Sequence, residues 1–149
     1  MHRAATALLA AVSLSACALS PPRDLYAGYG IDFGTYVANS GVSTFCFLPQ
    51  LRLAIWSVEA HFGRHVVVTS GYRDPINNWI VGGKEDSYHQ KCMAADFFIP
   101  GVNKSDIINF LYRDDLVGGM GCYPGQGFVH MDVRQRPPGW THPVTFSGC

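Results

Sequence analysis

The sequence predicts a small α+β domain in which helices lie on one side of a mainly antiparallel sheet. Three observations indicate this class: an amphipathic segment at 49–62, a β-branched run directly after it, and two strand-like segments joined by a short turn. The chain of 149 residues has room for one domain, and its 48% apolar residues suffice for one core. Sixteen glycines and nine prolines indicate many loops rather than long helices.

The segment 49–62 is predicted to be the main helix. Its apolar residues recur in steps of three and four, which places them on one helix face that packs against the core. Pro49 stands in the first turn and Gly63 follows the last, as is typical of helix ends. The residues of the apolar face are Leu48, Leu51, Ile55, Val58 and Phe62.

The other predicted elements are shorter. The run of three valines before Thr69 favours a strand, and Gly71 ends it. Pro124-Gly125-Gln126-Gly127 has the chemistry of a hairpin turn and joins the last two strands. In chain order the elements are strand 65–70, strand 94–99, helix 105–111, strand 118–123 and strand 128–133.

The N-terminus has the features of an export signal. Arg3 precedes an apolar run, Ala4 to Leu14, which is too short to span a bilayer. The run ends in Leu14-Ser15-Ala16-Cys17, which resembles a bacterial lipobox, so the resemblance implies a lipid on Cys17. An ordinary secretory signal with a cysteine at its end is the alternative. A lipid would tether the domain to a membrane without spanning it.

The chain therefore divides into a signal peptide at 1–16, a linker and N-terminal segment at 17–45, and the folded domain at 46–149. Within the second part, Ser20 to Asp32 has two prolines, two glycines and little periodicity, which predicts a linker. We expect an exported, periplasmic lipoprotein, and Ala18 favours the outer membrane because the aspartate that often retains lipoproteins at the inner membrane is absent.

Charge and cysteine content limit the partners and the redox state. Eleven basic residues balance eleven acidic ones, so we expect no nucleic-acid partner and membrane contact only through the lipid. In an oxidising compartment the four cysteines after Cys17 predict two disulfides, and spacing leaves three pairings open. No C-x-x-C pair is present, which argues against a thiolate zinc site. These cysteines are Cys46, Cys92, Cys122 and Cys149.

Two histidines and one aspartate are candidate metal ligands. His89 and Asp96 lie seven residues apart, where a loop turns into a strand, and His130 lies on a separate predicted strand. Imidazole and carboxylate are suitable zinc ligands, and three protein ligands leave a fourth position for water, as in catalytic sites. The spacing by itself is weakly specific, since such residues recur by chance over forty positions.

Three motifs that follow one another along the chain make the prediction of a metal site more specific. Ser70-Gly71-Tyr72-Arg73, Ser87-x-His89-x-x-x-x-Ala94-x-Asp96, and the segment 119–133 with His130 resemble the M15 peptidases, the D-alanyl-D-alanine carboxypeptidase and murein endopeptidase family. The resemblance covers 47–140, and the segment 119–133 resembles particularly the periplasmic murein endopeptidase branch. It implies the fold that these peptidases share with the hedgehog signalling domain.

The resemblance also implies a chemistry. His89, Asp96 and His130 would hold zinc, and Arg73 would face the substrate and stabilise a developing oxyanion. The expected reaction is hydrolysis of amide bonds in peptidoglycan stem or cross-link peptides, by an endopeptidase or a D,D-carboxypeptidase. For Arg73 the alternative is a surface salt bridge to Asp74 or Glu85.

Two positions depart from the family pattern. Several branches have a glutamate three residues before the last zinc histidine, where this chain has Gly127. Asp132 shares a strand face with His130, so we expect it to act as the base or to orient that imidazole. His142 and Glu85 are weaker candidates for the base.

The second departure is Cys92, which stands where the family usually has glycine, so a positive φ there would strain it. Cys122 is also unusual, and from these two departures we expect a Cys92–Cys122 bond that leaves Cys46 to pair with Cys149. Both departures also support an alternative function, a catalytically inactive module that binds peptidoglycan or a partner. Retention of all three ligands and Arg73 favours catalysis.

Overall fold

The computed structural model describes residues 23–149 as one seven-stranded sheet with three α-helices. The predicted signal peptide and Cys17 lie outside the described residues. The helices are α1 (Pro49–Phe62), α2 (Pro75–Ile80) and α3 (Lys104–Leu111), preceded by the 3-10 helix η1 (Arg23–Tyr26). The strands are β1 (Gly30–Asp32), β2 (Thr35–Val37), β3 (Val67–Ser70), β4 (Ala94–Phe98), β5 (Gly119–Gly121), β6 (Val129–Asp132) and β7 (Val144–Phe146).

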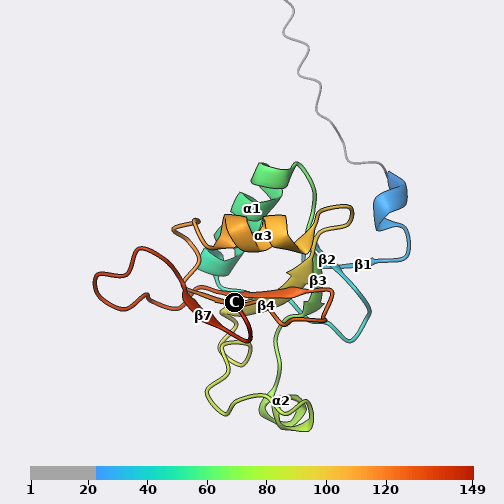
Figure 1. Cartoon of the computed structure of the whole chain (residues 1–149). Helices are drawn as coiled ribbons and strands as arrows, with labels where there is room; N and C mark the ends of the chain where they lie inside the picture. Colours follow the sequence, from blue (N-terminus) through green and yellow to red (C-terminus); the bar gives the residue numbers. More distant parts are fainter. Residues whose placement is uncertain (1–22) are drawn as a thin grey trace, which may run out of the picture.

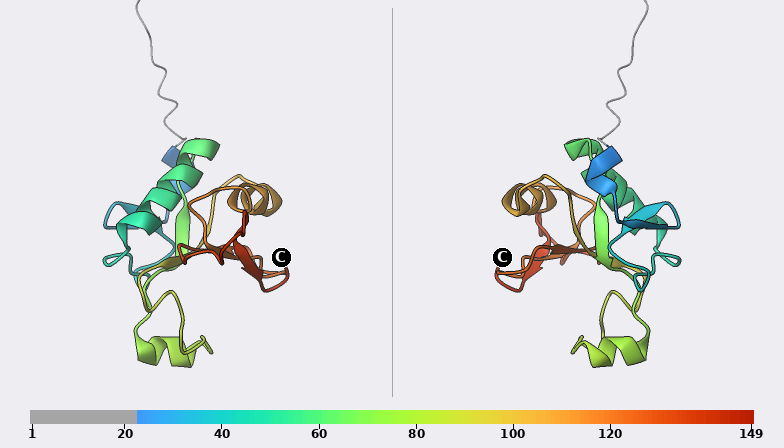
Figure 2. Two further views of the ribbon diagram at one scale, coloured as in Figure 1. Left: turned by 90° about the vertical axis from the view of Figure 1, so that its left-hand side faces the viewer. Right: turned by 90° about the vertical axis from the view of Figure 1, so that its right-hand side faces the viewer.

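The sheet order is β1-β2-β3-β4-β6-β5-β7. Strand pairs are antiparallel except β2 with β3 and β5 with β7, which are parallel. Helices α1 and α3 cover one face of the sheet, and α2 projects from the opposite side (Figures 1 and 2). The molecule is therefore a mixed, mostly antiparallel α+β fold, as the sequence predicted.

The core lies between the two covering helices and the sheet. Helix α1 buries the middle of the predicted apolar face, whereas Leu48 before its start is 36% exposed and Phe62 at its end is partly buried. The helix ends at Gly63, whose φ of 61° closes it in the left-handed region. The buried side chains of α1 are Leu51, Ala54, Ile55 and Val58. No helix of the described part is long and apolar enough to cross a bilayer.

The predicted elements from residue 49 to 133 agree with the structure to within two residues at each end. The N-terminal linker prediction, which extended to Asp32, was wrong at its end. Strand β1 pairs with β2, and the Asp32 carboxylate accepts hydrogen bonds from the backbone and hydroxyl of Thr44 at 2.6 and 2.9 Å. A three-residue edge strand is held by backbone pairing, so it needs no side-chain periodicity that a sequence pattern could reveal.

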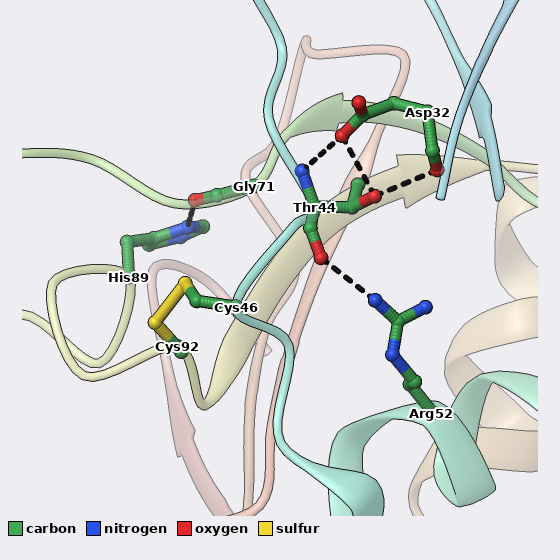
Figure 3. The surroundings of a disulfide bond; sticks show 7 residues. All are labelled: Asp32, Thr44, Cys46, Arg52, Gly71, His89 and Cys92. Atoms are coloured by element: carbon green, nitrogen blue, oxygen red, sulfur yellow. Dashed lines mark hydrogen bonds between the residues drawn. A yellow bond between two sulfur atoms is a disulfide. The ribbon is translucent and has the colours of Figure 1, made fainter. Parts of the chain in front are cut away.

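The disulfides correct a second prediction. Cys46 pairs with Cys92 and Cys122 with Cys149, so the expected Cys92–Cys122 and Cys46–Cys149 bonds were wrong. Figure 3 shows the first bond beside His89. Two disulfides indicate an extracytoplasmic compartment.

Backbone hydrogen bonds within the chain explain why these cysteines lie side by side. The amide of Leu48 donates to the carbonyl of Cys92 at 3.1 Å, which brings Cys46 to the same place. Strand β7 pairs with β5, so the C-terminal Cys149 lies beside Cys122. Cys92 has a φ of 58°, which agrees with the glycine that the family pattern has at this position.

Candidate metal centre

Neighbouring strands bring the three candidate ligands together. Asp96 on β4 lies directly opposite His130 on β6 in the antiparallel register. His89 lies in the metal loop, which we define as residues 81–93 between α2 and β4. The three side chains are buried, with exposed fractions of 3% for His89, 4% for Asp96 and 5% for His130.

One atom of each side chain points to a common position. Asp96 Oδ1 lies 2.8 Å from His130 Nδ1 and 3.2 Å from His89 Nε2, and the two nitrogens are 3.2 Å apart. A tetrahedral zinc ion with bonds of about 2.0–2.1 Å separates its ligand atoms by about 3.3–3.4 Å. The three atoms therefore have almost the spacing that one ion requires, and the group is consistent with a metal site.

The other nitrogen of each imidazole has its own acceptor. His89 Nδ1 lies 2.7 Å from the carbonyl oxygen of Gly71, as Figure 3 shows, which leaves Nε2 free for a metal. His130 Nε2 lies 3.0 Å from Asp132 Oδ2, which leaves Nδ1 of His130 for a metal. Such contacts fix the tautomer and the ring orientation, so the free lone pairs converge on one point.

Arg73 lies at the same centre. Its Nη2 donates to Asp96 Oδ2 at 2.8 Å and its Nε donates to Ser70 Oγ at 2.8 Å. The alternative salt bridges to Asp74 and Glu85 are absent among the described residues, and Asp74 instead caps α2. Arg73 also lines a cleft that opens beside the three candidate ligands, so its guanidinium contacts both a candidate ligand and the space that a substrate would enter.

Asp132 lies behind His130 and is fully buried. Its carboxylate accepts from Arg134 as well as from His130, and Arg134 Nε donates to Oδ1 at 2.7 Å. The guanidinium of Arg134 lies 4.2 Å from the ring centre of Tyr88, next to His89 in the chain. This geometry suits a group that orients His130, and it keeps the Asp132 carboxylate away from solvent.

Sequence reasoning missed Arg134. Alternate residues of an extended segment share a face, so the order His130, Asp132, Arg134 was the available signal. The weaker candidates for a base do not line the cleft: Glu85 is exposed and His142 stacks on Tyr112 with ring centres 5.3 Å apart.

Hydrogen bonds within the site shift the pKa values of both carboxylates and of His130. Burial alone would raise the pKa of Asp96, but hydrogen bonds from His130 and His89 outweigh it and hold the pKa far below its usual range. Burial likewise opposes ionisation of Asp132, and its bonds to His130 and Arg134 nevertheless lower its pKa. Burial lowers the pKa of His130, but the bonds to Asp132 and Asp96 raise it overall. Both carboxylates are thus ionised at neutral pH.

A cleft of about 900 Å³ opens beside these residues. The metal loop forms one wall, and the C-terminal residues Val144, Phe146 and Ser147 line another part. The aromatic residues Tyr88, Tyr123 and Phe128 also line it, whereas Tyr72, beside Arg73, does not. Position 127 points into open space, since a Cβ on Gly127 would meet no heavy atom within 4 Å.

Comparison with known proteins gives one family. The family model described as Peptidase M15 matches residues 30–132, which include all three candidate ligands and Arg73. The match also includes β1, and so begins before the segment that the sequence motifs had indicated. No significant match was found among curated proteins or among solved structures.

Proposed function

We propose, from the premise that this chain belongs to the peptidase M15 family, that it is a zinc-dependent peptidase acting on peptidoglycan stem or cross-link peptides. The observation that carries the proposal is the convergence of His89 Nε2, Asp96 Oδ1 and His130 Nδ1, with the second nitrogen of each imidazole already bonded elsewhere.

The donor set fits zinc better than a hard cation, because two of its three atoms are imidazole nitrogens. Zinc in such a site lowers the pKa of water and polarises a carbonyl group. The residues of the chain have separate tasks: Asp132 orients His130, and Arg73 fixes Asp96 while its charge faces the cleft. An arginine in that position suits a substrate carbonyl or carboxylate, with which it forms directed hydrogen bonds.

The positions of the N-terminal side and of the metal loop support a location at a membrane surface. Helix η1, where the described chain begins, lies on the side of α1, whereas the metal loop that follows α2 lies on the opposite side of the sheet (Figures 1 and 2). A lipid on Cys17 would hold the N-terminal side at a membrane, and the cleft would then face away from it. This orientation suits an exported enzyme that works on the nearby cell wall.

Digestion of muropeptides by the zinc-loaded protein tests the proposal. We expect cleavage that a chelator abolishes and added zinc restores, and that His130→Ala lacks. His61→Ala is the matched control, because His61 stacks on Phe110 outside the cleft and its loss should leave cleavage unchanged. Retained cleavage in His130→Ala would contradict the assignment of the site.

A non-catalytic peptidoglycan-binding module is the second candidate. The observation that favours it is that no glutamate lines the cleft among residues 23–149, while Asp132 is buried behind His130. Binding of muropeptides to the zinc-loaded protein without cleavage at any pH between 5 and 9 would support the module.

A further inference from the structure

The second wall of the cleft is built by the C-terminal arm, which we define as residues 133–149. These residues lie after the end of the family match at residue 132. They contribute Arg134, Val144, Phe146 and Ser147 to the lining of the cleft. The arm faces the same space as the metal loop, so the two segments together set the width available to a substrate.

The arm is held firmly to the sheet. Strand β7 pairs with β5 in register, so that Phe146 lies opposite Gly121. The amide of Tyr123 donates to the carbonyl of Ser147 at 2.8 Å, and the Cys122–Cys149 bond fixes the end of the arm. A segment with backbone pairing and a covalent link cannot swing aside when a larger ligand enters.

The ring of Phe146 lies beside one of the candidate ligands, His130. Its ring centre lies 5.2 Å from that of His130 and 6.3 Å from that of Tyr123. The guanidinium of Arg134 lies 5.5 Å from the same ring. A Cβ on Gly121 would come within 2.7 Å of the ring, so the close approach of Phe146 requires glycine there.

We propose that Phe146 is a specificity-determining residue, which narrows the cleft beside His130 and excludes peptides with a bulky branch next to the cleaved bond. The inference rests on the proposed peptidase function. The ring is half-buried and lies against the side chains of Tyr123, His130 and Arg134, so its position in the cleft is defined before a ligand binds. A rigid apolar wall discriminates between ligands of different size by about 10–200-fold.

The test uses two synthetic stem peptides with the same cleaved bond. One has a free side-chain amine on the residue next to that bond, and the other has a dipeptide attached to the amine. We expect Phe146→Ala to raise the ratio of kcat/KM for the branched over the linear peptide by about tenfold or more. Phe146→Tyr should keep the wild-type ratio, and so should Phe33→Ala, which removes an exposed ring on the β1–β2 turn.

A second variant separates specificity from packing. Cys122→Ser/Cys149→Ser frees the arm without changing Phe146, and we expect the ratio to rise while the zinc content stays at the wild-type level. Equal loss of kcat/KM for both peptides in Phe146→Ala, with a ratio changed by less than about twofold, would overturn the proposal and leave Phe146 as packing for His130.

Failure of the proposed function gives a different result. In that case neither peptide is cleaved by the wild type, and the affinities of both peptides are compared instead, with and without zinc. A branched peptide that gains about tenfold in affinity on Phe146→Ala, while the linear peptide does not, still supports the role of the ring. If the branched peptide binds the wild type and Phe146→Ala with the same affinity, the proposed role of the ring is wrong.

Discussion

At the scale of single residues, each candidate ligand is held by a group that does not face the metal position. The Gly71 carbonyl holds His89, Asp132 holds His130, and Arg73 holds the second oxygen of Asp96. These partners fix the orientation of the donor atoms before a metal binds. They add charge as well, because Asp132 makes the imidazole of His130 more basic and therefore a stronger ligand.

Asp132→Asn tests this role. The substitution keeps the size of the side chain but removes its charge, so His130 loses a strong acceptor and Arg134 loses its ion-pair partner. We expect zinc affinity to fall by about 10–100-fold, measured by competition with a chelating dye.

The matched control for that experiment is Asp114→Asn. Asp114 accepts a hydrogen bond from Ser57 and does not line the metal cleft, so zinc affinity should not change. An equal loss of affinity in both variants would assign the effect to general destabilisation rather than to the orientation of His130.

At the scale of elements, α2 is a six-residue helix whose start depends on one carboxylate. Asp74 accepts hydrogen bonds from the amides of Ile76 and Asn77 at 2.9 and 3.0 Å. The bond from Asn77 is the largest cause of its pKa lying below the ordinary value. The cap matters for the site because the metal loop, which lines the cleft, begins where α2 ends.

The lowered pKa gives this cap a defined pH dependence. A group whose pKa is lower in the folded state stabilises that state above its unfolded pKa, about 3.9 for aspartate, and this contribution is lost as the pH falls through the folded pKa. We expect the amide shifts of Ile76 and Asn77 to titrate with a midpoint below about 3.9 in an NMR pH series. Asp74→Asn keeps an acceptor without a charge, so both transitions should disappear while α2 remains. A midpoint at or above that of free aspartate would contradict the capping role.

Elements with a sequence pattern inside one segment were predictable because such patterns are local. The apolar face of α1 and the valine run at the start of β3 each lie within one segment, so the sequence alone indicates these elements. Strands β1 and β7 have three residues each and gain their stability from pairing with distant chain, which no local pattern shows. Disulfide pairing failed for the same reason, since the Leu48–Cys92 contact that places Cys46 joins residues far apart in sequence.

The same distinction between local patterns and long-range contacts applies to the residues of the site. The three candidate ligands and Arg73 stand in motifs with a family resemblance, so the sequence alone named them as candidates. Arg134 and Phe146 reach the cleft through the ion pair with Asp132 and through the pairing of β7 with β5, which depend on the folded structure. Residues that long-range contacts bring to the cleft are thus harder to predict than residues that stand in a motif.

At the scale of the whole molecule, each wall of the cleft is tied to another part of the fold by one disulfide. Cys46–Cys92 closes the metal loop onto the segment before α1, where the buried Thr44 is held by Asp32 and by Arg52 (Figure 3). Cys122–Cys149 ties the C-terminal arm. The two bonds therefore have different roles. The first fixes the metal loop, which contains the candidate ligand His89, and the second fixes the C-terminal arm, which contains no candidate ligand.

Removing each bond separately tests this division. The bonds span 46 and 27 residues of chain, and loop-closure entropy gives each of them a similar stabilisation of about 4 kcal/mol. We expect Cys46→Ser/Cys92→Ser and Cys122→Ser/Cys149→Ser to lower the free energy of unfolding by similar amounts, measured with urea on metal-free protein. Zinc affinity should fall by about tenfold or more in the first variant only, because only that bond restrains the loop that places His89.

A third variant, Cys46→Ala/Cys92→Gly, separates stability from zinc affinity. Glycine suits the φ of 58° at position 92, so this variant should be more stable than Cys46→Ser/Cys92→Ser but should bind zinc no more tightly. Equal losses of zinc affinity in the two serine variants would mean that the sheet alone places His89, and that the loop disulfide contributes only stability.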